Sequence, residues 1–482
     1  MKRIFFALAA LAALPLVSRA GETVVRLNVR PMAEPKPALK YLLLPEVREL
    51  EPGNPVQYYL RCFAEQRNFF FNKQSVAQRA RYRTMPLAKL AAEKQRNYGG
   101  NALRQVDWAA RLNAVDWEMT QRVQTAGLDL SLPELPPLRV LATALQVRFR
   151  IEVAGRRFDD AVRTTKTMFA LARHLGEHPA EAANLTGLSV AELAVDTLEE
   201  MVQQPDCPNL YWALTDLPRP LVDLRKGLQG SCTLVAADFR PIRDDAVMTA
   251  EEMENVVSRL SGLMAFAREQ AGETPRSLRA SLKTHVADQQ RVRAIRDRLF
   301  EARRAALLPR TRDEETPRVL LDRVVKLSYE KDLIEKFSPL QIILLDEKRQ
   351  YEVRRDETMK LLALAPWQID ALDGAKRERG EDELFADLPP HVLKDRRAQG
   401  RLEQRIALLR HVEALRLYAA AHDGKWPEKL ADIAVPLPVD PFTGKPFVYK
   451  VEGAIAHLDG GSPRGEEKNP TYNIGYEVVI RK

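Results

Sequence analysis

Cysteine is scarce in this chain, whose 482 residues include only Cys62, Cys207 and Cys232. Exported domains that are held together by disulfides are dense in cysteine and usually carry an even number of them. The count excludes a disulfide scaffold, so stability must come from a hydrophobic core. Two arrangements of the thiols stay open: Cys207 pairs with Cys232 and leaves Cys62 free, or all three are buried and unpaired.

The sequence also lacks the short motifs that identify common enzyme classes. It contains no G-x-S-x-G elbow, no Walker loop and no dinucleotide fingerprint. Its net charge of +8 comes from 74 Lys and Arg against 66 Asp and Glu, and the two signs are interspersed. Mixed charge of this kind is typical of a solvated surface, so no nucleic-acid partner is expected.

Long apolar runs are missing except at the N-terminus. There Lys2 and Arg3 precede the run Ile4–Val17, and small residues lead up to Gly21. A basic head, about 7–15 apolar residues and a small-x-small end are the three parts of a secretory signal peptide. A transmembrane helix needs about 20 apolar residues, so residues 1–20 are predicted to be removed and no membrane span to remain.

Helical periodicity dominates from residue 56 onward, after a Pro-rich segment (21–55) that is expected to be extended. The clearest pattern is a pair of helices, from Leu138 and from Phe158, joined at Gly155. The pair, with A-G-R-R-F-D-D-A over 154–161, resembles a tetratricopeptide-type repeat, although no second copy follows at a fixed period. Further helices are predicted over 105–124, 180–204, 249–271, 277–308 and 339–364.

The last 80 or so residues differ in kind. A predicted helix over 402–419 precedes a predicted hairpin over 447–458, and the final strand alternates from Tyr472 to Ile480. With H-D-G-K-W-P (422–427) and V-D-P-F-T-G-K-P-F-V-Y (439–449), this tail resembles the globular part of the type II secretion major pseudopilin. A pseudopilin carries that module directly behind a very hydrophobic helix, which is absent here, so a filament subunit is not expected.

These patterns predict a mostly α fold, an irregular solenoid-like body of helical hairpins with a small C-terminal α+β module. The remainder of the chain resembles exported bacterial proteins without an assigned activity. The predicted divisions are a signal peptide (1–20), an extended and helical region (21–137), a helical body (138–369), a charged linker (370–400) and the pseudopilin-like module (401–482).

One candidate metal site is the H-x-x-E-H pattern of inverted zinc peptidases, formed by His174, Glu177 and His178. Zinc chemistry needs both imidazoles on one helical face, with Glu177 as the base. Gly176 is a helix stop, and Pro179 disfavours helical geometry at the residue before it. We therefore expect a structural corner, and a zinc-dependent hydrolase is the alternative.

A second candidate is the acidic loop that contains Asp459, Glu466 and Glu467, which resembles the calcium loop of the pseudopilin module. Calcium takes six to eight oxygen ligands, and three carboxylates supply some of them. Arg464 and Lys468 in the same loop would oppose the ion, so a solvated turn is expected. No other cofactor is indicated.

Taken as a set, these features predict an exported, non-catalytic helical scaffold or protein-interaction protein of the cell envelope. Its partner would be an unidentified envelope protein, because faces that helical arrays leave free suit docking. The predicted location is the periplasm, the envelope or the medium.

The N-terminal pattern gives a direct test. We expect the mature chain to begin at Gly21 and to be found outside the cytoplasm, because the three parts of a signal peptide are present in order. N-terminal sequencing of protein from its native cells checks this. A cytosolic pool that retains Met1 would contradict it.

Overall fold

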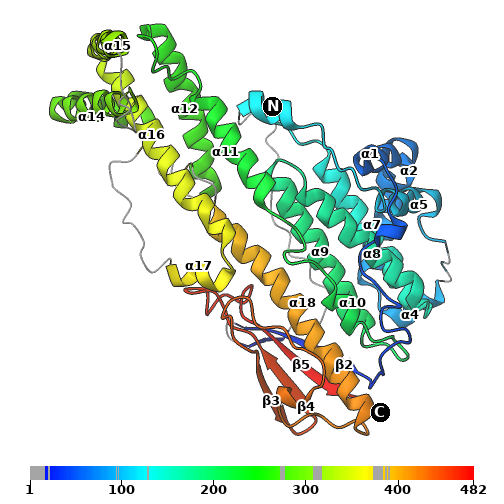
Figure 1. The fold of residues 1–482 in the computed structure, drawn as a ribbon. Coiled ribbons are helices and arrows are strands. Elements are labelled where there is room, and N and C mark those ends of the chain that lie inside the picture. The colour runs from blue at the N-terminus through cyan, green and yellow to red at the C-terminus, as the bar shows by residue number, and fades with distance from the viewer. Residues whose placement is uncertain are drawn as a thin grey trace.

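The computed structural model describes residues 17–19, 22–93, 95, 97–127, 130–271, 277–307, 317–372, 384–385, 388 and 391–481. Most of these residues are helical, and a small sheet lies at one end of the molecule (Figure 1). The predicted fold class, a mostly α body with a small strand module, is confirmed. In this part of the chain, no helix combines the length and the apolar composition that crossing a bilayer requires.

Short helices make up the first part of the body. They are η1 (Val47–Glu49), α1 (Pro55–Glu65), α2 (Arg67–Phe71), α3 (Lys73–Thr84), α4 (Leu87–Ala92), α5 (Gly100–Ala109) and α6 (Thr120–Ala126). The start of α1 follows from its sequence, since Asn54 Oδ1 accepts a hydrogen bond from Val56 N at 3.1 Å and proline occupies the first helical position.

The single helix predicted over 105–124 is wrong, because a loop separates α5 from α6. In that loop, Arg111 O accepts from Glu51 N at 2.9 Å. The Asn54 side chain donates to Asp116 O at 2.6 Å. The 51–54 segment thus supplies hydrogen-bond partners that the next turn of a continuous helix would otherwise provide. This is a tertiary effect, and intrinsic helix propensity does not predict it.

The predicted helical pair is confirmed as α7 (Leu135–Ala154) and α8 (Phe158–Gly176), and α9 (Glu181–Met201) packs against both. Close contact between α8 and α9 depends on Gly187, where an added Cβ would lie 2.7 Å from Ala172 O. A larger residue at 187 would force the two helices apart.

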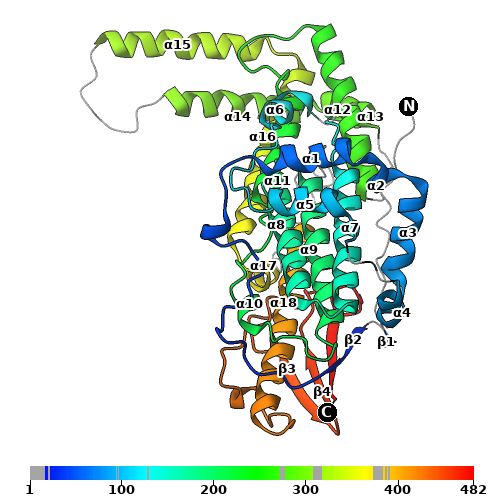
Figure 2. The same cartoon turned by 90° about the vertical axis from the view of Figure 1, so that its right-hand side faces the viewer.

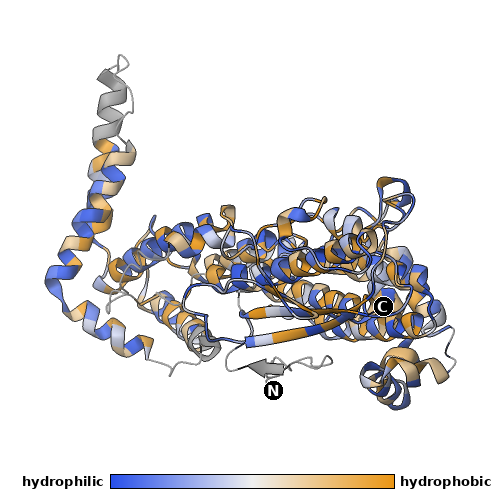
Figure 3. Ribbon diagram, turned by 90° about the horizontal axis from the view of Figure 1, so that it is seen from below, coloured by the Kyte–Doolittle hydropathy of each residue, from blue (hydrophilic) through white to orange (hydrophobic). Residues whose placement is uncertain are grey.

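A second hydrophobic core lies beyond α9 and joins a later group of helices. These are α11 (Arg225–Phe239), α12 (Ala250–Ala271), α13 (Leu278–Ala287), α14 (Gln289–Leu307), α15 (Pro317–Glu335) and α16 (Pro339–Met359). The short α10 (Tyr211–Thr215) lies between α9 and α11 in the chain, and η3 (Lys360–Ala363) and α17 (Pro366–Leu372) follow α16. Figure 2 and Figure 3 show α14 and α15 projecting from the rest of the molecule.

Local capping explains two boundaries in this group. The helix predicted over 277–308 is interrupted at Asp288, whose carboxylate caps α14 by accepting from Arg291 N at 3.0 Å. The sequence S-P-L-Q over 338–341 has an N-cap serine, a proline at the first helical position and a glutamine that can close a capping box. Ser338 does cap α16, since its Oγ accepts from Gln341 N at 3.2 Å. The expected return bond of a capping box is absent, because the Gln341 amide donates instead to backbone oxygens of the 243–246 segment.

The helix predicted over 402–419 is longer than expected: α18 (Val392–Ala421) begins before residue 401. The predicted boundary between the linker and the module therefore falls inside a helix. The start of the predicted linker, 370–372, belongs to α17, and most of 373–390 lies outside the described residues.

The sheet has the order β1-β2-β5-β4-β3. The predicted hairpin is present as β3 (Val448–Glu452) and β4 (Ile455–Asp459), and the alternating strand as β5 (Ile474–Ile480). The segment expected to be merely extended supplies β2 (Glu22–Val29), which runs parallel to β5 (Figure 1). The short β1 (Val17–Arg19) pairs with β2 in the antiparallel sense. Apart from β1, the predicted signal peptide lies outside the described residues.

One hydrophobic core unites the two ends of the chain with the helical body. It contains Leu27 of β2, Leu188 of α9, Leu409 of α18 and Tyr476 of β5. The tail therefore does not bury its apolar residues by itself. Both the N-terminal strand and α9 complete its packing.

This shared core predicts the effect of a charge placed in it. Leu409 is 1% exposed, so Leu409→Asp should lower the free energy of unfolding by about 4 kcal/mol, by removing a packed side chain and burying an unpaired carboxylate. Val448→Asp is the matched control, because Val448 is 64% exposed on β3. Denaturant unfolding measures both, and equal losses would contradict the assignment of the core.

Candidate functional site

The three candidate zinc ligands bind separate partners. His174, in the last turn of α8, has its Nδ1 2.9 Å from Tyr59 Oη. Glu177 pairs with Lys226 on α11, and His178 Nε2 lies 3.3 Å from Glu134 Oε1. Because α8 ends at residue 176, the two imidazoles do not share a helical face. The structure has the expected corner and does not assemble the H-x-x-E-H geometry.

Burial also sets the charge of His174. Removal from water and, to a smaller extent, the charge of the neighbouring Arg173 lower its pKa to about 3. The imidazole is thus neutral near pH 7 and packs beside the Tyr59 ring. A neutral, half-buried histidine with a hydroxyl partner stabilises the packing at this corner.

The candidate calcium ligands are also directed elsewhere. Glu466 accepts from Arg397 Nη1 at 3.3 Å and from Asn469 Nδ2 at 2.8 Å. Glu467 accepts from the backbone N of Gly465 at 2.9 Å, within its own turn. Over the described ranges, no three His, Cys, Asp or Glu side chains are grouped to hold a metal ion. The structure does not bring Asp459, Glu466 and Glu467 together as a ligand set.

The cysteines are free thiols in the structure, so the Cys207–Cys232 pairing is not formed. All three are buried, and burial raises the pKa of Cys207 to about 12 and that of Cys232 to about 11. A thiol must ionise to act as a nucleophile. These side chains are therefore inert components of the core.

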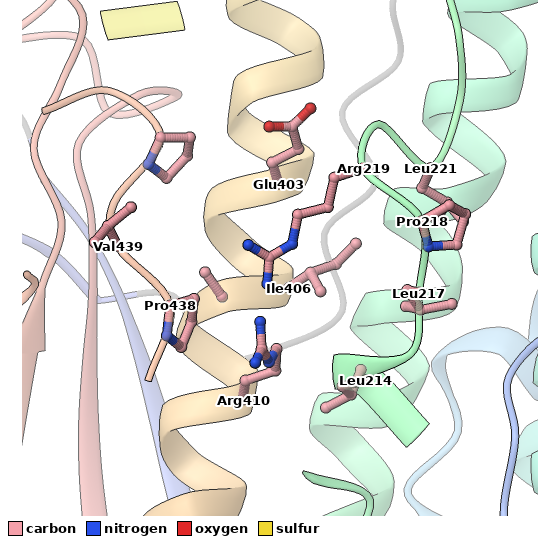
Figure 4. Close-up of a pocket in the computed structure, with 12 residues that line it drawn as sticks. Leu214, Leu217, Pro218, Arg219, Leu221, Glu403, Ile406, Arg410, Pro438 and Val439 are labelled. Carbon is pink, nitrogen blue, oxygen red and sulfur yellow. The ribbon is translucent and has the colours of Figure 1, made fainter. Parts of the chain in front are cut away.

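A cleft of about 460 Å³, a volume that includes space open to solvent, lies where three segments meet (Figure 4). One wall is the middle of α18, the second is the 214–221 segment after α10, and the third is the 438–441 segment before β3. Apolar and proline side chains supply most of the lining: Leu214, Leu217, Pro218, Leu221, Ile406, Ala407, Pro438, Val439 and Pro441.

Three charged side chains complete the cleft. Arg410 is 4% exposed, and its Nε and Nη1 have no hydrogen-bond partner among the described residues. Its guanidinium carbon lies 5.7 Å from the centre of the Tyr211 ring. Figure 4 shows the guanidinium groups of Arg410 and Arg219 directed toward one another, with Glu403 farther along α18.

The electrostatics follow from this arrangement. Burial lowers the pKa of Arg410, and the positive charge of Arg219 lowers it further. Burial raises the pKa of Glu403, against the attraction of Arg396 and Arg219. The cleft contains the guanidinium groups of Arg219 and Arg410 and one carboxyl group, that of Glu403, so it has a surplus of positive charge. Guanidinium groups bind anions and do not act as bases, so this arrangement suits recognition.

Sequence reasoning missed Arg219 and Arg410. The apolar residues of this helix (402, 406, 409 and 412) predict one buried face, and residue 410 lies off that face. In the structure, however, residues on all sides of this part of α18 are buried. The L-P-R-P-L sequence over 217–221 was the available signal, since an arginine between prolines is held in a rigid loop. Comparisons with known protein families, curated proteins and solved structures found no match.

A buried pair of acids lies near the start of α18. Asp395 is buried near the carboxyl group of Glu181 on α9, and Ser231 Oγ donates to Glu181 Oε2 at 2.9 Å. Burial, and then the neighbouring carboxyl group of Glu181, raise the pKa of Asp395 to about 8, against the attraction of Lys394. Asp395 is therefore protonated in the folded chain near pH 7.

This pair predicts how stability depends on pH. In the unfolded chain Asp395 loses its proton near pH 4, whereas in the folded chain it keeps the proton to about pH 8. Its stabilising contribution to the free energy of unfolding is therefore fully present below pH 4. Across that interval the folded state binds more protons, and the contribution falls by up to about 1.4 kcal/mol per pH unit. Asp395→Asn removes this dependence and should stabilise the protein increasingly from pH 4.5 to pH 8.

Unfolding curves of the parent protein and the variant at several pH values measure the difference. Asp216→Asn is the matched control, because Asp216 is exposed. Parallel pH profiles for the parent protein and Asp395→Asn would show that the acid pair does not share a proton.

Proposed function

We propose that the protein is an exported, non-catalytic interaction protein of the cell envelope, and that it holds a segment of a partner protein in the cleft beside α18. The cleft lining carries this proposal, since apolar side chains form its walls and the buried Arg410, with two nitrogens that lack a hydrogen-bond partner, lies among them. Sites with these two properties bind an apolar body and orient it through a few polar contacts.

The rim of the cleft also favours docking. Val439 is 51% exposed there, and prolines stand on both sides of the opening, in the 214–221 and 438–441 segments. Proline restricts the backbone before a partner arrives, so less conformational entropy is lost on binding. An exposed apolar side chain on a rigid rim is a typical anchor for a partner chain.

Export is supported by the three-part pattern of residues 1–20. The proposed location in the envelope and the proposed partner are consistent with each other, because a signal peptide would deliver the protein to proteins of that compartment. A helical body with a cleft beside its last long helix would then serve as the scaffold.

Photo-crosslinking in the native cells tests the proposal. A benzophenone amino acid at position 439 should form an adduct with one partner protein, whereas the same group at position 448 should not. Val448 is the matched control, since it is also an exposed valine but does not line the cleft. Adducts of equal yield at both positions, or none at 439 in exported protein, would contradict docking in the cleft.

A further inference from the structure

We propose that Arg410 and Arg219 form a carboxylate-binding site at the base of the cleft, and that it takes the C-terminal or side-chain carboxylate of a peptide. That the occupant is a peptide rests on the function proposed above. The affinity for a carboxylate rests on the geometry of the two arginines alone.

The first reason is that Arg410 differs from Arg405 and Arg416 on the same helix. Arg405 lies 2.7 Å from both Asp196 and Glu199, and Arg416 lies 2.9 Å from Glu413. Arg410 is also buried, yet no carboxylate of the described residues lies within ion-pair distance of it. A buried cation without a carboxylate partner destabilises the fold, so an external anion has a large effect there.

The second reason is the position of Arg219. Its side chain is exposed on the 214–221 segment and points toward Arg410 across the cleft (Figure 4). Two cations that face each other repel, and an anion between them replaces that repulsion by two attractions. Because Arg219 is exposed, it can shift to admit the anion and then close over it.

The remaining lining selects the kind of anion. A carboxylate is planar and accepts two parallel hydrogen bonds from one guanidinium group. Glu403 lies two helical turns from Arg410, about 10 Å along α18, and repels a second negative charge. The apolar walls accept hydrocarbon next to the anion. A singly charged carboxylate attached to an apolar chain fits these features better than a phosphate group does.

Three synthetic peptides test the site on the purified full chain. The first is acetyl-Ala-Leu-Leu with a free C-terminal carboxylate, the second is the same peptide with a C-terminal amide, and the third is an amidated acetyl-Leu-Glu-Leu. Isothermal titration calorimetry should show that the first or the third binds at least about tenfold more tightly than the second, since a hydrogen bond to a charged group contributes about 1.5–3 kcal/mol. The tighter of the two identifies the source of the carboxylate.

Two variants connect this preference to the arginines. Arg219→Gln, on an exposed segment, should reduce the preference for the carboxylate with little effect on folding, and Arg410→Met should abolish it. Arg410→Met should also raise the unfolding temperature of the free protein, because it removes a buried charge that has no carboxylate partner. Arg240→Gln is the control, since Arg240 is exposed and does not line the cleft.

Equal binding of the acid and the amides would overturn the proposal, as would stronger competition by inorganic phosphate than by acetate. A preference that survives in both arginine variants would overturn it too. These failures are distinct from failure of the proposed function. Carboxylate binding in solution without a crosslinked partner in cells would refute the proposed docking and leave the anion site standing.

Discussion

The charge buried along α18 is the constraint on which the rest of the structure depends. Arg416 is fully buried, and its Nη1 lies 2.9 Å from both carboxylate oxygens of Glu413. Its Nη2 donates to Cys207 O at 2.7 Å and its Nε to Arg30 O at 3.0 Å. One side chain thus joins α18 to the loop after α9 and to the chain after β2. Without these partners, the buried cation would cost several kcal/mol.

A second buried group positions the sheet. Glu199 of α9 accepts hydrogen bonds from Arg405 of α18 at 2.7 Å and from the hydroxyl of Tyr476 on β5. Burial raises the pKa of Glu199, and Arg405 opposes that shift. Because both partners must reach the same carboxylate, α9, α18 and β5 have one arrangement that satisfies all three. Arg410 lies between these clusters and has no such partner, which distinguishes the cleft from the surrounding core.

The tail illustrates how far local patterns extend. Its long helix, its hairpin and its final strand follow from apolar spacing and turn residues, and all are present. The parallel pairing of β2 with β5 does not follow from these local patterns. It places Val25 opposite Tyr476, and these residues are separated in sequence by nearly the whole chain. The likeness of the tail to a pseudopilin module stays a resemblance of sequence. In this protein the sheet is completed by the opposite end of the chain.

By itself, the sequence determined the mostly α class, the α7–α8 pair, the cap at Ser338 and the alternation of β5, because each depends on residues within a few turns of one another. Only the tertiary structure decided where the 105–124 helix breaks and how His174, Glu177 and His178 divide among separate partners. It also decided which arginines of α18 are neutralised. Arg405 and Arg410 look alike in sequence, and they differ only in whether a folded neighbour presents a carboxylate. That neighbour comes from a distant part of the chain, so local periodicity carries no information about it.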